Sequence, residues 1–196
     1  VYHVATDWKR YQGSWGDAVK IWEGGLGIPG GLAAGIIVGV LVARKRGISP
    51  SGILDAVIPS LPIAQAIGRL GNWFNQELFG GPTDLPWGLK IDEAHRPTEF
   101  MDVATFHPTF LYEGLWNLAL AWFLMRVDAR RVLKPGHLLG LWIFGYGLGR
   151  LWVEALRIDH ASLIAGVRVN IWLSMIALAA GALITLKGRQ KLGSDK

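Results

Sequence analysis

The chain has 196 residues, of which 51% are hydrophobic and only 18% are charged, with ten tryptophans and 26 glycines. A soluble domain carries about 25% charged residues, so this composition favours a polytopic membrane protein over a soluble enzyme or binding module. The net charge of +5 comes from clustered basic residues, which argues against a nucleic-acid-binding face, and the absence of cysteine excludes disulfides, thiolate metal sites and a cysteine nucleophile.

The first expected membrane span covers residues 24–43, which are 20 residues without a charge and end at Arg44-Lys45-Arg46. The chain before it starts V-Y-H-V-A-T-D-W, with no initiator methionine or signal peptide, so we expect it to begin inside a polar loop of a longer protein. The stretch G-G-L-G-I-P-G-G at 24–31 lacks the Lys-Ser/Thr of a phosphate-binding P-loop. It is either the start of a helix that packs closely through small residues or backbone exposed to a ligand at the membrane surface.

Four further spans follow in chain order, and three of them carry ionisable residues. Residues 48–68 carry Asp55, residues 108–125 carry Glu113, residues 136–156 carry Arg150 and Glu154, and residues 170–186 carry no charge. Residues 69–106 are polar and broken by Gly and Pro, which predicts a small head outside the lipid with short strands at 87–91 and 98–101. Residues 157–169 are expected to form a loop.

The basic residues predict how these spans cross the membrane. If the chain alternates sides, segments 44–46, 126–134 and 187–196 share one side and hold 3, 4 and 4 Lys/Arg, which is 11 of the 20. Short, densely basic loops mark the cytoplasmic side. The sequence therefore predicts an all-α polytopic integral membrane protein, residues 1–196 forming a single membrane domain with five spans, an external head at 69–106 and a cytoplasmic C-terminus.

Charged side chains within a span cost roughly 2.5–3.5 kcal/mol each on insertion scales, so each needs a reason. Pairing with one another or with backbone inside the bundle explains an isolated residue such as Asp55 as well as a functional role does. Arg150 favours function, because Tyr146 lies four residues before it and Glu154 four residues after it, which makes one polar stripe on a helix.

A second polar group follows the span at 48–68. Arg69 alone is explained as an arginine that reaches from the helix end to the interface. However, Asn72, Asn75 and Glu77 follow within two helical turns, and Arg69 and Asn72 are spaced to share a face. A guanidinium fork suits a phosphate, so two arginines at one depth predict a site for a lipid headgroup.

The histidines point to no metal site. His107 precedes Pro108 at the start of the span at 108–125, and it is either a base or a residue that contacts the helix start. The other four histidines are scattered through loops without metal-ligand spacing, and no nucleophile motif is present.

Three segments together resemble the prolipoprotein diacylglyceryl transferases of bacterial inner membranes. G-R-L-G-N-W-F-N-Q-E-L-F-G at 68–80 is similar to that family's signature G-R-x-G-N-F-x-N-x-E-x-x-G, with Trp73 where Phe is usual. H-P-T-F-L-Y-E at 107–113 resembles H-P-S-Q-L-Y-E, and G-Y-G-L-G-R-L-W-V-E-A-L-R at 145–157 resembles the Tyr-to-Arg stripe of the penultimate helix. The order and spacing agree over essentially the whole chain.

The resemblance implies an enzyme with seven spans, of which this chain holds the last five. It implies transfer of the diacylglyceryl group of phosphatidylglycerol to the lipobox cysteine thiol of a preprolipoprotein, with a thioether as product, glycerol phosphate as leaving group and no cofactor. It implies a multi-pass protein of the bacterial plasma membrane, in contact with membrane lipids and without a nucleic-acid partner.

The resemblance also assigns residues. Arg69, Asn72, Asn75 and Glu77 match the polar positions of the signature; Tyr146, Arg150 and Glu154 match the second essential region; Asp55 matches an acidic position. Gly30 and Gly31 match a His-Gly-Gly motif in which Pro29 replaces the histidine. We expect Arg69 and Arg150 to hold the phosphate and favour the thiolate, the asparagines to orient the headgroup, Glu77 and Glu154 to fix the arginines, and His107 to act as base.

Two other classes of function use the same residues. A lipid or anion transporter would bind a headgroup in transit through Arg69 and Arg150, and a polytopic scaffold would use its polar residues only for helix packing. Transporters often contain internal repeats and paired broken helices, and no repeat occurs here. The expected external position of the polar cluster, where an exported substrate arrives, favours the enzyme.

Overall fold

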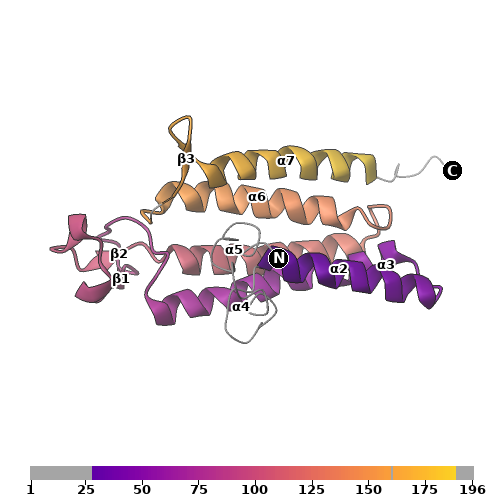
Figure 1. Cartoon of the computed structure of the whole chain (residues 1–196), viewed down its shortest axis with the longest axis horizontal. Helices are drawn as coiled ribbons and strands as arrows, with labels where there is room; N and C mark the ends of the chain where they lie inside the picture. The colour runs from indigo at the N-terminus through magenta and orange to yellow at the C-terminus, as the bar shows by residue number, and fades with distance from the viewer. Residues whose placement is uncertain (1–27, 160, 189–196) are drawn as a thin grey trace, which may run out of the picture. The chain divides into compact units, whose positions relative to one another are not determined.

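The computed structural model describes residues 28–159 and 161–188 (Figure 1). Internal contacts divide the chain into two units, residues 1–53 and 54–196, which we describe separately. The first unit contains helix α2 (Ile28–Lys45) and the start of α3 (Pro50–Val57). Pro29 fits the first turn of α2 because its missing N–H needs no partner there, and Arg44 and Lys45 complement the helix dipole at the other end.

The second unit is a row of four helices, each packed on the next along the chain (Figure 1). They are α4 (Ser60–Asn75), α5 (Thr109–Ala129), α6 (Leu138–Leu156) and α7 (Val169–Gly188). Buried Leu120 and Leu124 of α5 and Leu138 of α6 form an apolar cluster with Ile58, which precedes α4. The connections are short between α5 and α6, and the longest one, between α4 and α5, forms the head.

Glycines allow α5, α6 and α7 to approach closely. A Cβ on Gly181 of α7 would lie 2.5 Å from the backbone nitrogen of Phe144 and 2.6 Å from the carbonyl oxygen of Gly140, both in α6. Gly149 of α6 lies against the indole of Trp116, whose Nε1 donates to the carbonyl of Gly145 at 2.9 Å. Small residues at such interfaces are typical of membrane helix packing.

Gly181→Ala is expected to destabilise the α6–α7 pair, because the atoms that the new methyl group meets are backbone and cannot move aside. Overpacking of this kind costs roughly 1–3 kcal/mol, which should lower the thermal unfolding midpoint in detergent. Gly71→Ala in α4 is the matched control, since nothing in the described part of the chain lies within 4 Å of a Cβ there, and its midpoint should not fall. An equal midpoint for both variants would contradict the close approach.

The head contains two short paired strands and two 3-10 turns. Strand β1 (Leu89–Lys90) pairs antiparallel with β2 (Thr105–Phe106), and the turns are η4 (Glu93–His95) and η5 (Thr98–Phe100). Phe79, Ile91 and Phe106 form its buried core. The strand predicted within 87–91 is present, but the one predicted at 98–101 is wrong. Pro97 starts a turn there, and its carbonyl accepts the N–H of Phe100 at 2.9 Å.

The span predicted at 48–68 is divided at Ile58 and Pro59 into α3 and α4, because proline lacks the N–H that would continue the helix, and two boundaries also differ from the prediction. Helix α4 does not end at residue 68 but continues to Asn75, where Gln76 adopts a left-handed φ of 49° and ends the helix. Arg69, Asn72 and Asn75 are therefore helical, and the head begins only after them. The predicted loop at 157–169 contains a hairpin of β3 (Leu163–Ile164) and β4 (Val167–Arg168), with the left-handed residues Ala165 and Gly166 in its turn.

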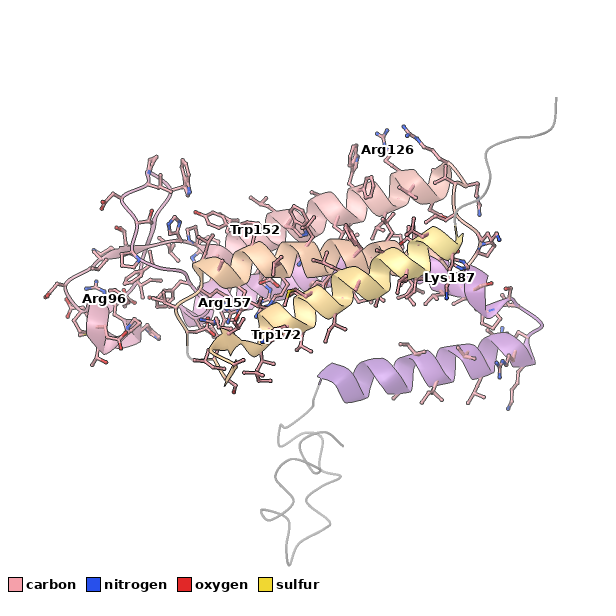
Figure 2. All side chains as sticks on the ribbon, turned by 90° about the horizontal axis from the view of Figure 1, so that it is seen from above. Arg96, Arg126, Trp152, Arg157, Trp172 and Lys187 are labelled. Carbon is pink, nitrogen blue, oxygen red and sulfur yellow. The ribbon has the colours of Figure 1, made fainter. Side chains whose placement is uncertain are left out.

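Within the described residues, two helical stretches are long and apolar enough to cross a membrane, Pro50–Asn75 and Val169–Gly188. Helix α5 adds an exposed apolar face that suits lipid, formed by Leu111, Leu115, Leu118, Trp122 and Met125. Figure 2 shows Arg126 and Lys187 at the end of the helices away from Arg96 and Arg157. The mostly helical class is confirmed, while the number of spans and their sidedness stay predictions.

Candidate functional site

The two arginines singled out in the sequence meet at one buried carboxylate. Arg69 of α4 and Arg150 of α6 each lie 3.5 Å from a different oxygen of Glu113, which projects from α5 between them. The Glu113 side chain is only 5% exposed, whereas Arg69 and Arg150 keep 25% and 15% exposure. Two guanidinium groups that face one carboxylate would repel each other without it. The shared Glu113 therefore holds the two arginines together, and both stay partly accessible.

Arg150 has a second acidic partner one helical turn further along α6. Its Nη2 lies 2.7 Å from Oε2 of Glu154, whose side chain is fully buried. The other oxygen of Glu154 accepts from Nε of Arg168 at 2.6 Å and from Nδ2 of Asn170 at 3.2 Å. As expected from the spacing, Glu154 orients Arg150, but it is shared with a residue of the hairpin before α7.

Around Arg69, the polar residues of the segment at 68–80 form a relay of hydrogen bonds. Nη1 of Arg69 donates to Oδ1 of Asn72 at 3.0 Å, and Oε1 of Glu77 accepts from Asn72 at 3.0 Å and from Asn75 at 3.1 Å. Glu77 therefore holds the two asparagines rather than an arginine. The acid that pairs with Arg69 is Glu113, from the next helix.

The charged network continues beyond α6. Asp159 lies 2.6 Å from Nε of Arg157 and 3.3 Å from Nη2 of Arg168. Burial disfavours the carboxylate, but the hydrogen bond from Arg157 and the charges of Arg157 and Arg168 outweigh it and hold the pKa of Asp159 below its usual value. Desolvation likewise opposes the charged form of Arg157, yet the hydrogen bond and charge of Asp159 raise its pKa. Arg157 and Asp159 are thus both charged at neutral pH, and their ion pair fixes the chain directly after α6.

Gly80, which ends the segment at 68–80, ties α4 to the ends of α5 and α6. Its N–H donates to the carbonyl of His107 at 2.8 Å, and Gly81 donates to the carbonyl of Leu156 at 3.0 Å. A Cβ on Gly80 would lie 2.7 Å from Thr109 and 2.8 Å from the Leu156 oxygen. Only glycine fits this close approach, which holds the segment after α4 against the start of α5 and the end of α6.

His107 lies in an aromatic group at the start of α5. Its Nδ1 is 3.2 Å from the hydroxyl oxygen of Tyr112, which also accepts from Nε1 of Trp87 at 2.8 Å. Tyr112 in turn stacks on Trp152. Within residues 28–159 and 161–188, the side-chain interactions of His107 are with Tyr112 and reach neither arginine, so its expected role as a base stays a prediction.

Several predicted site residues do not join the arginine network. Tyr146 packs against the apolar cluster of Leu120 and Leu138 and stacks on Trp142, one helical turn below Arg150. Asp55 lies 14 residues before Arg69, and its Oδ2 accepts the N–H of Gly136 at 2.7 Å, just before α6. Asp55 therefore holds the start of α6, at the helix end away from Arg150, because that N–H has no partner within the helix.

Gly30 and Gly31 belong to the first unit and lie within α2, whose helix already begins at Ile28. Residues 28–31 therefore form the start of a helix, which is one of the two alternatives given for 24–31, and Pro29 supports its first turn. Residues 24–27 lie outside the described part of the chain.

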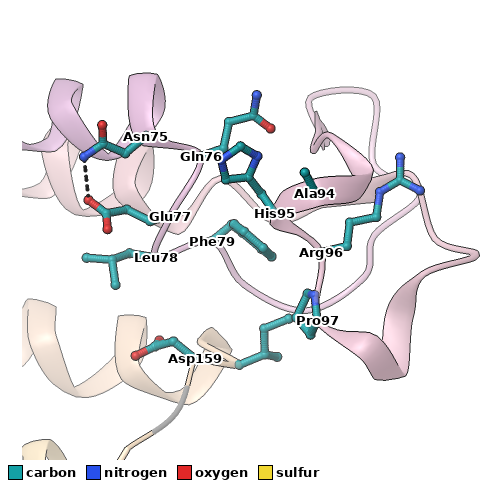
Figure 3. A pocket seen from close by; sticks show the side chains of 11 residues that line it. Asn75, Gln76, Glu77, Leu78, Phe79, Ala94, His95, Arg96, Pro97 and Asp159 are labelled. Atoms are coloured by element: carbon teal, nitrogen blue, oxygen red, sulfur yellow. Dashed lines mark hydrogen bonds between the residues drawn. The ribbon is translucent and has the colours of Figure 1, made fainter.

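A cavity of about 430 Å³ lies where the head meets the helix ends (Figure 3). It is lined by the segments 75–79, 94–97 and 158–159. Leu78, Phe79 and Pro97 contribute apolar surface, while Glu77 and Asp159 bring a carboxyl group from either end of the polar network. The cavity therefore meets the polar network at Asn75, Glu77 and Asp159, while Arg69 and Arg150 do not line it.

No cluster of three or more His, Cys, Asp or Glu residues with a metal-binding arrangement occurs in the described ranges 28–159 and 161–188. The site is instead built from guanidinium, carboxylate and amide groups. The guanidinium groups among them recognise phosphate through charge and bidentate hydrogen bonds, and the amides can add further N–H donors.

Sequence reasoning left two members of the network without a role, Glu113 as the link between the arginines and Arg168 as the second partner of Glu154. Glu113 carried a signal, because it is an acid inside an otherwise apolar segment. Arg168 had none, since a loop arginine 14 residues from Glu154 becomes its neighbour only through the hairpin.

Comparison with known proteins shows the family to which the chain belongs. Residues 1–187 match the family described as prolipoprotein diacylglyceryl transferase. The chain is 52% identical to a phosphatidylglycerol–prolipoprotein diacylglyceryl transferase of Frankia alni over its whole length, and 45% identical to those of Cutibacterium acnes and Streptomyces coelicolor over 98% and 100% of its length. It spans 52%, 66% and 63% of these relatives. By this match, the chain belongs to the prolipoprotein diacylglyceryl transferase family.

Proposed function

We propose that this chain forms the catalytic region of an enzyme that transfers the diacylglyceryl group of phosphatidylglycerol to the lipobox cysteine of preprolipoproteins, the first step of lipoprotein maturation. The observation that carries the proposal is the meeting of Arg69 and Arg150 at Glu113, beside the relay of Asn72, Asn75 and Glu77. The names of the relatives, which give phosphatidylglycerol and prolipoprotein, support the choice of substrates.

In the proposed reaction, the cysteine sulfur attacks the glycerol carbon that bears the phosphate. A carbon–sulfur bond forms, the carbon–oxygen bond to phosphate breaks, and glycerol phosphate leaves with the electron pair, while the thiol proton passes to a base. The chain contains no cysteine, which fits a thiol supplied by the substrate. A free thiol has a pKa near 8.5, and adjacent cations favour the thiolate.

Arg69 and Arg150 would hold the phosphate from two sides and stabilise the charge that develops on it as the bond breaks. Glu113 orients both guanidinium groups, and Glu154 orients that of Arg150 in addition. Asn72 and Asn75 would orient the headgroup with uncharged amides that do not cancel the positive field. Gly30, Gly31, Tyr146 and Asp55 stay predicted substrate-binding residues on the resemblance alone.

The proposed proton acceptor is His107, through its Nε2. For that nitrogen to be free of hydrogen, Nδ1 must carry the proton and donate to the hydroxyl oxygen of Tyr112, 3.2 Å away. Tyr112 would then fix the tautomer and the ring orientation of His107, as the orienting group of a base commonly does.

We place the head and the hairpin at 163–168 on the external side of the bacterial plasma membrane, with the C-terminus in the cytoplasm. The basic residues at the far helix ends support this orientation. Phosphatidylglycerol would then reach the arginines from the outer leaflet, and the exported polypeptide would reach them from the head.

The test is incubation of the full-length protein with phosphatidylglycerol vesicles and a synthetic lipobox peptide. We expect the peptide cysteine to gain the mass of a diacylglyceryl group with equimolar release of glycerol phosphate. Movement of lipid between leaflets without a mass gain would contradict the transferase and support a transporter. Neither outcome would support a scaffold.

The cavity beside Glu77 and Asp159 is the proposed seat of the peptide residues next to the acceptor cysteine, so filling it should weaken peptide binding selectively. Ala94→Phe is expected to raise the KM for the peptide by roughly tenfold, equivalent to about 1.4 kcal/mol, and to leave the KM for phosphatidylglycerol unchanged. Thr98→Phe adds the same ring to an exposed position that does not line the cavity and should change neither constant. An unchanged peptide KM for Ala94→Phe would contradict this placement.

A further inference from the structure

Arg168 projects from the hairpin before α7 into the charged network, and three contacts fix its position. Its Nε contacts Glu154 at 2.6 Å, its Nη1 donates to the carbonyl of Arg157 at 3.1 Å, and its Nη2 lies 3.3 Å from Asp159. The hairpin itself is anchored by Nε1 of Trp172, which donates to the carbonyl of Ile164 at 3.1 Å. Arg168 is thus a preorganised cation, with its side chain only 18% exposed.

The ion pairs form one alternating chain of charges. In order they join Arg69, Glu113, Arg150, Glu154, Arg168, Asp159 and Arg157, which makes four cations against three anions. Glu77, connected to Arg69 through Asn72, balances the excess cation at the outer end. Loss of any one guanidinium would therefore leave acid in excess around the remaining arginines.

Glu154 is the point at which this balance acts on the phosphate site. With Arg168 present, one oxygen of Glu154 is engaged by Arg168 and the other by Arg150. Without Arg168, the buried carboxylate would place its whole charge on Arg150 and weaken the attraction of Arg150 for an incoming anion. The interior of a helix bundle screens charges poorly, so the charge of Arg168 affects the attraction between Arg150 and an anion even though Glu154 lies between the two arginines.

From this arrangement we infer that Arg168 is a positioning residue that sets the anion affinity of Arg150 by sharing Glu154. The inference rests on the proposed function, because it takes the anion to be the phosphate of phosphatidylglycerol. A purely structural role would be lost in any variant that breaks the Arg168–Glu154 contact, whereas the proposed role depends on the balance of the two charges. Asn170 still holds the same oxygen of Glu154 at 3.2 Å, so removal of the Arg168 charge leaves an anchor for the carboxylate in place.

The test uses Arg168→Gln in the full-length protein. We expect the KM for phosphatidylglycerol to rise about five- to tenfold with kcat within twofold, and direct binding of phosphatidylglycerol in nanodiscs to weaken by the same factor. Arg168→Lys should recover most of the affinity, because an ammonium group can also neutralise Glu154. Lys90→Gln removes an equal charge from the head at an exposed position and should leave the KM unchanged.

The double variant Glu154→Gln with Arg168→Gln separates charge from structure. With both charges gone, Arg150 regains its field, so the KM should return to within about threefold of the wild-type value even though kcat is lower. A double variant with a KM at or above that of Arg168→Gln would overturn the inference, as would an unchanged KM in Arg168→Gln itself. Failure of the proposed function is a distinct result, since the wild-type protein would then transfer no lipid.

Discussion

Glu113→Gln is expected to lower kcat for lipid transfer by at least about tenfold without raising the KM for phosphatidylglycerol. The carboxylate lies 3.5 Å from both Arg69 and Arg150, and glutamine keeps its size but not its charge. The two guanidinium groups would then repel each other and lose their common alignment, while the field that attracts phosphate would grow. A tenfold loss corresponds to about 1.4 kcal/mol of transition-state stabilisation.

The same variant should also be less stable. Removing one partner of a buried ion pair costs up to roughly 3–5 kcal/mol, and we expect the lower end of this range here because Arg69 and Arg150 stay partly exposed and Arg150 keeps Glu154. Steady-state kinetics and the thermal unfolding midpoint in detergent measure the two effects. Asp128→Asn removes a carboxylate from the far end of the same helix and should alter neither. A raised lipid KM with normal kcat would show that Glu113 acts on binding rather than on alignment.

Arg150→Lys is expected to lower kcat/KM by roughly a hundredfold, or about 2.7 kcal/mol. Lysine preserves the charge but removes the planar fork, and Arg150 uses separate nitrogens for Glu113 and Glu154. A single ammonium group cannot keep both contacts and also bind two phosphate oxygens. Lipid transfer to the peptide, followed by mass, measures the loss.

Arg126→Lys is the matched control for this substitution. Arg126 lies near the opposite end of α5 over the ring of Trp122, at 5.0 Å, and should tolerate lysine with normal activity. Wild-type turnover in Arg150→Lys would exclude a bidentate phosphate contact at that position. It would leave open a simple requirement for positive charge, which Arg150→Gln would then test.

The sequence predicted the helices well because their signal is local. Long apolar stretches indicate helices that suit lipid, and α5, α6 and α7 begin and end within four residues of the predicted spans. The predicted end of α4 was seven residues too early, because polar residues end an apolar stretch without ending the helix. Arg69, Asn72 and Asn75 are compatible with a helix, and only the left-handed Gln76 ends it.

The candidate site was only partly predictable. Spacing alone placed Glu154 beside Arg150, since four residues make one helical turn. Glu77 was expected to fix an arginine but holds Asn72 and Asn75, because the turn after α4 directs it back toward the helix end. Asp55, which the resemblance grouped with the site, accepts the N–H of Gly136 before α6, and its role in substrate binding stays a prediction.

By itself, the sequence determined the helical class, the family signature at 68–80 and the two arginines suited to phosphate, all of which depend on residue type and short-range spacing. Only the tertiary structure decided that Arg69 and Arg150 share Glu113 and that Arg168 shares Glu154. These pairings join residues 14 to 44 positions apart on different elements. Their proximity depends on the close packing of α4, α5 and α6 and on the hairpin before α7, which no local pattern encodes.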